Sequence, residues 1–385
     1  MYSRNVVKQE GRLLTRIEGG VPSDMFLNIR RRAAAVFAIM LLFLLVSACT
    51  GQRDPQDQGP ADNIRQQGRV EPRSDRKEST EKSDEEGKRD EKQVKKPDLP
   101  RAIAAGQDQE PSLKVYIVQD QQVKDMPFEE YVAGVVAGEI KNDWPMEAIK
   151  AQAVIARTFV LQFISEKGHS KYENAHVSTD IEEAQAWNAK AVNDRIRQAV
   201  EQTRGQVIVY QGEFARTWFH SNAGGKTATP KEGLNYKDEE PPYIQVVNSP
   251  DTNEAVEADA KNWSASFTKE KIIAAFEKAG KPIKDFSKIS IGQKGPSGRA
   301  LTIQVDDAEI SAAELRLALG TTDMRSTLID EIALKDGSVS MSGRGYGHGV
   351  GMSQWGAFNM ANNDKSAKDI INHYFKDVDI VTMWK

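Results

Sequence analysis

The sequence has little cysteine and no excess of positive charge. Cys49 is the one cysteine among 385 residues, which excludes a disulfide framework, a zinc site built from paired cysteines and a dithiol redox pair. Lys and Arg together number 52 against 56 Asp and Glu, which leaves a net charge of −4. A dedicated nucleic-acid-binding domain carries a clear basic excess, so we expect no nucleic-acid partner.

The apolar run near the N-terminus is short for a membrane span. It covers 16 residues, 33–48, whereas a spanning helix needs roughly 20. Three arginines precede it, and Val-Ser-Ala leads directly into Cys49. A basic segment, an apolar run and small residues before a cleavage point are typical of a secretory signal peptide, which we therefore predict over 1–48. Residues 1–24 form an extension of this signal, and Met25 is an alternative start.

The residues around Cys49 indicate how the chain is held at a membrane. Val-Ser-Ala-Cys resembles a bacterial lipobox, in which the cysteine becomes the lipidated first residue of the mature chain. We expect Cys49 to carry a membrane lipid anchor and the rest of the chain to lie on the extracytoplasmic face of the cell membrane. The alternative is a single, uncleaved N-terminal transmembrane helix, which leaves the remainder on the same side.

Aromatic and large apolar residues are nearly absent from 51–101. Of these 51 residues, 13 are basic and 13 are acidic, so half of the segment is charged and the charges balance. Such a segment cannot bury enough apolar surface to offset the entropy of ordering. We predict a disordered, charged linker over 49–112 that separates the folded part from the membrane.

The folded part opens with a predicted strand and two predicted helices. Residues 114–118 (KVYIV) read as a strand. Apolar residues then recur at helical spacing over 127–140. The Asp-Trp-Pro turn ends this helix, and Pro145 suits the start of a second helix over 146–163. The two helices form a predicted hairpin.

Glu139 lies on the apolar face of the first predicted helix. It follows Val135 by four residues and Val132 by seven, and a carboxylate in such a position is rarely buried without a partner. One interpretation is an acid whose pKa is raised by apolar surroundings. The other is a core glutamate paired with Lys150 or Arg157, which share a face of the second helix. A nearby cation lowers a carboxyl pKa, and the sequence leaves both interpretations open.

Four ordered stretches carry a resemblance to a known family. Residues 127–162 (PFEEYVAGVVAGEIKNDWPMEAIKAQAVIARTFVLQ) resemble the opening motif of the SpoIID/LytB family. The VSTD and QAW segments within 177–187, a strand pair with the HSNAGGKT loop within 205–227, and GRGYGHGVGMSQWGA over 343–357 resemble the later motifs of that family. The match runs from about Leu113 to Lys385.

The predicted fold is mixed α/β of the α+β class, because the regular βαβα alternation of a doubly wound sheet is absent. The resemblance implies a SpoIID-type catalytic domain over 113–385, with an N-terminal helical hairpin and antiparallel strands. Within it, 251–319 is the part least like the family. We expect that stretch to be an accessory α/β insertion beside the cleft.

The resemblance implies a peptidoglycan lytic transglycosylase. Such enzymes cleave between N-acetylmuramic acid and N-acetylglucosamine with one carboxyl group, which first protonates the glycosidic oxygen. The same carboxylate then takes a proton from the C6 hydroxyl, and a 1,6-anhydro ring closes. The matching position here is Glu139, which the resemblance makes the catalytic acid and base. A partly buried carboxyl group suits the first step, because it is neutral at the start.

The resemblance also implies a setting and partners. The substrate is the glycan strand of peptidoglycan, stripped of its peptides by an N-acetylmuramoyl-L-alanine amidase partner, in sporulation and engulfment. A vegetative paralogue is the other reading of the same motifs. Two alternatives from other classes are a non-catalytic glycan-binding module that enhances an amidase and a scaffold in a membrane complex.

Glycine-rich loops let backbone N–H groups approach a sugar closely, so we place substrate binding there and on the second helix. The candidates are Lys150, Gln152, Arg157, Ser221, Gly224, Gly225, Lys226, Arg344, Tyr346, His348 and Gln354. His220 precedes Ser221, but no Gly-x-Ser-x-Gly elbow surrounds this serine, which argues against a nucleophilic serine.

We predict no metal and no cofactor. None of the five histidines forms a His-x-x-His or His-Glu-x-x-His pattern. Some family members are associated with zinc near the Asp…Gln segment, held by His and Cys. Here that segment offers His176, Asp180, Glu182 and Glu183 but no cysteine.

Overall fold

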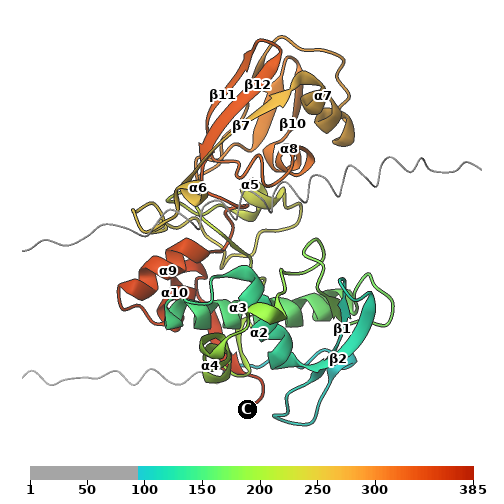
Figure 1. The fold of residues 1–385 in the computed structure, drawn as a ribbon, viewed down its shortest axis with the longest axis vertical. Helices are drawn as coiled ribbons and strands as arrows, with labels where there is room; N and C mark the ends of the chain where they lie inside the picture. The colour runs from blue at the N-terminus through green and yellow to red at the C-terminus, as the bar shows by residue number, and fades with distance from the viewer. Residues whose placement is uncertain (1–93) are drawn as a thin grey trace, which may run out of the picture. The chain divides into compact units, whose positions relative to one another are not determined.

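The computed structural model describes residues 94–385 (Figure 1). The predicted signal peptide, Cys49 and most of the charged linker lie outside the described residues. The described part begins inside the expected linker, where Lys96 donates a hydrogen bond to the carbonyl of Thr382 and the short helix η1 (Arg101–Ile103) buries Ile103. Packing on the domain therefore begins before the predicted boundary at 112.

The predicted helical hairpin is present. Helix α2 (Phe128–Glu139) begins directly after Pro127, and α3 (Met146–Lys167) begins after Pro145 and ends where Gly168 adopts a positive φ of 79°. Strands β1 (Ser112–Ile117) and β2 (Gln122–Pro127) form an antiparallel hairpin before α2, and β3 (Val177–Ser178) pairs with β1 in parallel. Apolar side chains of these elements share one core.

Helix α3 passes through the interior of this part. Among the described residues it is the helix that is long and apolar enough to cross a membrane, with a mean hydropathy of 1.2 over 18 residues. Because 78% of that window is buried in the protein, its apolar character is that of a core helix.

The remaining elements of this part come from the middle and from the end of the described chain, and their strands pair with each other. Strands β4 (Gln206–Tyr210), β5 (Glu213–Phe214) and β14 (Asp379–Thr382) form one sheet in the order β14-β4-β5, and β6 (Phe219–His220) pairs in parallel with β13 (Met352–Ser353). Around them lie η2 (Ala189–Ala191), α4 (Asp194–Gln202), α5 (Pro230–Leu234), α9 (Gln354–Asn362) and α10 (Ala367–Tyr374). The last motif of the sequence is thereby brought next to the helical hairpin.

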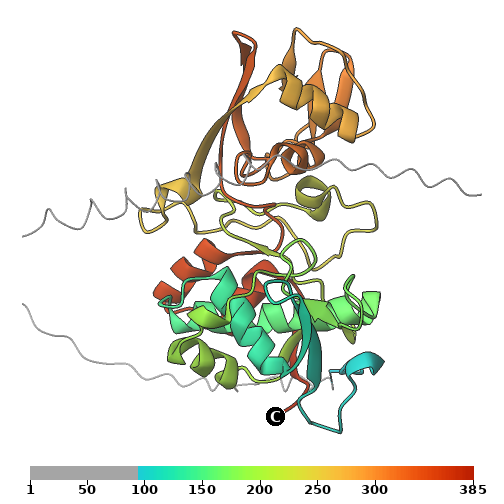
Figure 2. The same ribbon diagram turned by 45° about the vertical axis from the view of Figure 1, so that its right-hand side comes forward.

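A separate hydrophobic core belongs to the accessory part, which Figure 2 shows in gold and orange. Helix α6 (Ala258–Lys261) leads into it. One sheet orders β11 (Ile329–Lys335), β12 (Ser338–Arg344) and β7 (Asn262–Thr268), and the other orders β10 (Ala308–Ser311), β9 (Thr302–Val305) and β8 (Ile289–Ile291), with α7 (Lys269–Lys278) and α8 (Ala312–Leu319) packed beside them. This core runs from Trp263 to Met341, so the accessory part extends beyond the predicted end at 319. The class is α+β, as predicted.

Candidate active site

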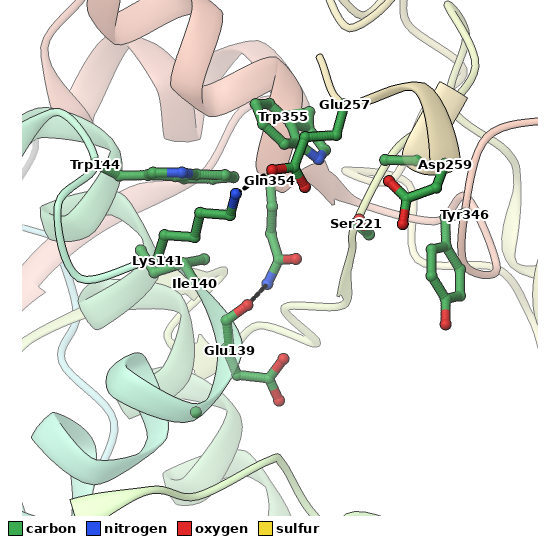
Figure 3. Close-up of a pocket in the computed structure, with 12 residues that line it drawn as sticks. Glu139, Ile140, Lys141, Trp144, Ser221, Glu257, Asp259, Tyr346, Gln354 and Trp355 are labelled. Carbon is green, nitrogen blue, oxygen red and sulfur yellow. Dashed lines mark hydrogen bonds and ion pairs between the residues drawn. The ribbon is translucent and has the colours of Figure 1, made fainter. Parts of the chain in front are cut away.

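A pocket of about 250 Å³ lies at the C-terminal end of α2 (Figure 3). Four segments that are far apart in the sequence supply its walls. Figure 3 shows the two tryptophans on one side and Ser221, Asp259 and Tyr346 on the other. The lining residues are Gly138, Glu139, Ile140, Lys141, Trp144, Ser221, Glu257, Asp259, Ala260, Tyr346, Gln354 and Trp355.

Glu139 is the last residue of α2, and its carboxylate accepts a hydrogen bond from a backbone N–H. Oε1 accepts from the backbone N–H of Ala186 at 2.7 Å. Burial raises the pKa of Glu139 to about 7, although the Ala186 N–H and the Gln354 side chain act in the opposite direction. Among the described residues no cation pairs with this carboxylate, so the interpretation as a salt-bridged core glutamate is wrong.

Two glycines on α2 explain how Ala186 reaches Glu139. A Cβ on Gly138 would lie 2.7 Å from the Ala186 backbone, and one on Gly134 would lie 2.2 Å from the Trp187 ring. The segment after Gln185 therefore lies directly on the helix, and the N–H of Asn188 donates to the carbonyl of Gly134 at 2.8 Å. The QAW motif thus packs on α2, and the backbone N–H of its Ala186 donates to the Glu139 carboxylate.

Two cations of α3 that were predicted to approach Glu139 do not. Lys150 pairs with Glu147 at 2.7 Å. Arg157 is completely buried and bonds Glu129 through Nε and Nη2, the latter at 2.6 Å. This expectation is wrong because each cation pairs with another carboxylate. Lys150 pairs with Glu147, one turn earlier on α3, and Arg157 pairs with Glu129 on α2.

Gln152 is connected to the site through Gln354. The Gln354 Nε2 donates to the main-chain oxygen of Glu139 at 3.2 Å and to the Gln152 Oε1 at 3.5 Å. Gln152 itself is fully buried. Two of the predicted binding residues are thus brought together, with Gln354 in the pocket wall and Gln152 behind it.

The HSNAGGKT loop contributes Ser221 to the pocket, whereas Gly224 and Gly225 do not line it. The N–H of Gly224 donates to Asn222 Oδ1 at 2.7 Å, and the N–H of Gly225 donates to Asp251 Oδ1 at 2.8 Å. The exposed Lys226 lies outside the lining residues. The expectation that the two glycine amides face a sugar is not met, because buried acceptors of the protein already occupy them.

The last motif contributes Tyr346, Gln354 and Trp355 to the pocket. Arg344 instead pairs with Asp330, with 3.0 Å between Nε and Oδ2. His348 packs against His220 with ring centroids 5.6 Å apart. Its Nδ1 accepts from the N–H of Val350 at 3.0 Å, and burial next to Arg316 and Arg299 lowers its pKa to about 3.

His348 is therefore neutral at physiological pH, and its ring stabilises its own loop by accepting the hydrogen bond from Val350. The glycines around it need the left-handed region, with φ of 112° at Gly347 and 84° at Gly349. At Gly349 a Cβ would also lie 2.5 Å from the Arg299 guanidinium carbon. The glycine-rich run thus serves close packing of the loop behind the pocket.

Three charged pocket residues, Lys141, Glu257 and Asp259, were missed by the sequence reasoning, and so were the two tryptophans of the wall, Trp144 and Trp355. Lys141 pairs with Glu257, and its Nζ lies 5.8 Å from the centroid of the Trp355 ring. Asp259 is exposed at the pocket. The two acids follow Asp251 in the stretch that resembles the family least, so no motif pointed to them.

The segment before Gln185 is fixed by side-chain hydrogen bonds. Glu183 accepts from the hydroxyls of Ser170, at 2.6 Å, and Ser178. Asp180 accepts from the Tyr172 hydroxyl at 2.8 Å. Within 94–385, no cluster of three or more His, Cys, Asp or Glu side chains is arranged to hold a metal ion.

The groups of this pocket are suited to proton transfer and to holding a small ligand. A carboxyl group that is partly protonated near pH 7 can donate a proton to an ether oxygen and later accept one. Trp144 and Trp355, with centroids 4.9 Å apart, offer an apolar wall, while Ser221, Tyr346 and Gln354 offer hydroxyl and amide groups. Such a mixture of aromatic and polar groups is typical of a small-ligand pocket.

Comparison with known proteins gives family matches over both parts. The model of the SpoIID family, described as stage II sporulation protein, matches residues 117–210, and a domain of unknown function matches 227–351. The chain is 33% identical over 260 residues to an uncharacterized protein of Brachyspira hyodysenteriae, covering 67% of this chain and 68% of that protein. It is 30% identical over 285 residues to stage II sporulation protein D of Bacillus amyloliquefaciens, covering 70% and 78%. A more distant match, 27% over 287 residues, is an amidase enhancer of Bacillus subtilis, of which 39% is covered.

Proposed function

Because the chain belongs to the SpoIID family of stage II sporulation proteins, we propose that it is a peptidoglycan lytic transglycosylase. Its substrate is the glycan strand, cleaved between N-acetylmuramic acid and N-acetylglucosamine. Membership in the family connects the chain with sporulation-related work on the cell wall. The observation that carries the proposal is Glu139, an acid with a pKa of about 7 and no paired cation among the described residues, in a pocket lined by aromatic and polar side chains.

The proposed reaction uses Glu139 twice. Its carboxyl group donates a proton to the glycosidic oxygen, and the bond between that oxygen and C1 of the muramic acid breaks. The resulting carboxylate takes the proton of the C6 hydroxyl, whose oxygen bonds to C1. The products are a 1,6-anhydro end and a free hydroxyl, the acid is protonated again, and no water is consumed.

The raised pKa supports this cycle. A carboxyl group with an ordinary pKa near 4.5 would be ionised at neutral pH, when the first step needs a proton on it. The Ala186 N–H holds one carboxylate oxygen, so the acid has a fixed orientation in the pocket. Substrate contacts in this proposal come from Trp144, Ser221, Tyr346, Gln354 and Trp355.

We place the protein on the extracytoplasmic face of the cell membrane. The support is the basic and apolar sequence before Cys49, which we assign as a signal peptide and a lipidation site. A single transmembrane helix remains the alternative anchor. In this setting an amidase partner removes the peptides before the glycan enters the pocket.

A second function is a glycan-binding module that enhances an amidase without cleaving the strand. The observation in its favour is the similarity to the amidase enhancer. The two functions differ in what Glu139 does. Purified wild-type protein and Glu139→Gln are incubated with amidase-treated sacculi, and both glycan release and co-sedimentation are measured. Release that is lost in the variant while sedimentation persists supports the enzyme, and sedimentation without release by either protein supports the module.

A further inference from the structure

Asp251 is a fully buried carboxylate behind the pocket that the proposed chemistry does not use. It accepts four hydrogen bonds. Two come from the N–H groups of Ala223, at 2.7 Å, and Gly225, at 2.8 Å. The others come from the hydroxyls of Ser249, at 2.8 Å, and Ser353, at 2.6 Å. The carboxylate therefore joins the HSNAGGKT loop to the last motif of the chain.

Arg299 holds the same loop from its other side. This guanidinium is fully buried and donates to the carbonyls of Ala223, at 2.6 Å, and Lys226, at 2.7 Å. Burial lowers the pKa of Arg299 to about 10, and the negative charges of Glu232 and, to a smaller extent, Asp251 act against that shift, so the cation keeps its proton at neutral pH. Two N–H groups of the loop, those of Ala223 and Gly225, thus donate to a buried anion, and two of its carbonyls, those of Ala223 and Lys226, accept from a buried cation.

The two segments joined by Asp251 carry one wall of the pocket. Asn222 and Tyr346 exchange backbone hydrogen bonds, each 2.9 Å long, and the N–H of Trp355 donates to the carbonyl of Ser221 at 3.0 Å. Ser353 also caps α9 by accepting from the N–H of Gly356 at 3.2 Å. Four lining residues depend on these bonds, namely Ser221, Tyr346, Gln354 and Trp355.

We propose that Asp251, together with Arg299, is a positioning pair that fixes this pocket wall relative to Glu139 and so controls how a glycan strand is held for cleavage. The inference rests on the proposed function for its substrate. Asp251 cannot contact the sugar, because it has no exposed surface and four donors already surround its two oxygens. Its effect is transmitted through Ser353 and the Ala223–Gly225 backbone.

The first test compares two aspartates with similar local bonding. Asp306 accepts from the N–H groups of Ser287, at 3.1 Å, and Lys288, at 2.9 Å, but it is an exposed residue of the accessory part outside the pocket. In the full chain, Asp251→Asn should lower kcat/KM on amidase-treated sacculi by at least tenfold, measured at a temperature where circular dichroism shows the variant folded. Asp306→Asn should stay within twofold of the wild type. A folded Asp251→Asn protein with wild-type kcat and KM would overturn the proposal.

A second pair of variants keeps the test decisive if Asp251→Asn does not fold. Ser353→Ala removes the hydroxyl that Asp251 holds, and Ser353→Thr retains a hydroxyl at the same position. The alanine variant should lose activity by at least fivefold and the threonine variant should recover most of it. Equal kcat/KM for the two would contradict the proposed connection.

A binding measurement separates this inference from the proposed function. The probe is the β-1,4-linked tetramer of N-acetylglucosamine, titrated calorimetrically into Glu139→Gln and into Glu139→Gln/Asp251→Asn. Weaker binding by the second protein supports the positioning pair even if the wild type never cleaves glycan. Loss of activity in Glu139→Gln alongside full activity and binding with Asp251→Asn would overturn the pair and leave the proposed function standing.

Discussion

The carboxylate of Glu139 and the backbone N–H of Ala186 lie 2.7 Å apart, measured between Oε1 and N. This bond crosses from the end of α2 to the segment that docks on Gly134 and Gly138. It orients the acid without supplying a full positive charge, so burial dominates and the pKa rises to about 7. An acid set up in this way can exchange protons near neutral pH.

The pH dependence of cleavage should follow Glu139. Because the first step needs the protonated acid, kcat/KM should fall as the pH rises through about 7. Initial rates on amidase-treated sacculi between pH 5 and pH 9 measure this, with substrate binding checked at each pH. A rate that keeps increasing up to pH 9 would exclude Glu139 as the proton donor.

The same group should make stability depend on pH. Its pKa in the folded state, about 7, is higher than the ordinary value of 4.5. Its contribution is therefore fully present below pH 4.5 and is lost as the pH rises through 7, by at most about 3 kcal/mol. Glu139→Gln, which cannot ionise, should gain in Tm relative to the wild type between pH 5 and pH 8. Parallel Tm curves for the two proteins would show that Glu139 has an ordinary pKa.

Gly138→Ala should weaken catalysis while leaving α2 intact. Alanine favours a helix over glycine by about 1 kcal/mol, but its Cβ would lie 2.7 Å from the Ala186 backbone. The docked segment must move, and the donor at Glu139 moves with it. We expect kcat/KM to fall about 10-fold to 100-fold, since small displacements at an active site have effects of that size. Unchanged kinetics in a protein with a normal circular dichroism spectrum would contradict this role for Ala186.

Helical spacing was sufficient to predict the hairpin and to single out Glu139, because both depend on periodicity within one segment. The hydrogen-bond donor to the Glu139 carboxylate could not be predicted in the same way, because it is the backbone N–H of Ala186, which lies 47 residues further along the sequence. Gly134 and Gly138 were visible in the sequence, but what packs against them is set by tertiary structure.

The carboxylate partners of the two cations on α3 could not be predicted from the sequence, for a related reason. Lys150 and Arg157 are seven residues apart on one helix face, yet each pairs with a carboxylate other than Glu139. Asp251 was invisible because a Ser-Pro-Asp turn is common and its four donors come from three separate segments. The core of the accessory part runs past 319 because β11 and β12 complete the sheet that begins with β7.

Arg157 and Lys150 should differ sharply in their effect on stability. Glu129 is buried and accepts from Arg157, from the N–H of Gly205 and from Trp384 Nε1. Arg157→Met leaves that carboxylate without its cation and should reduce the free energy of unfolding by about 3–5 kcal/mol. Lys150→Ala removes a partly exposed pair and should cost less than about 1 kcal/mol.

Urea denaturation measures both free energies, and the kinetics of the folded fraction are measured alongside. Arg157→Met protein that remains folded at low temperature should keep the KM of the wild type, because Arg157 has no exposed surface. A raised KM with little loss of stability would mean that Arg157 contacts the substrate after all.

The most direct measurement is the mass of the sugar ends released from amidase-treated sacculi by the wild-type protein and by Glu139→Gln. The account predicts muramic acid ends one water lighter than reducing ends from the wild type, and a loss of release in the variant by about 10²-fold to 10⁴-fold. Reducing ends would mean that water, rather than the C6 hydroxyl, attacks C1. Release of 1,6-anhydro ends by Glu139→Gln at the wild-type rate would contradict the assignment of Glu139 as the acid and base.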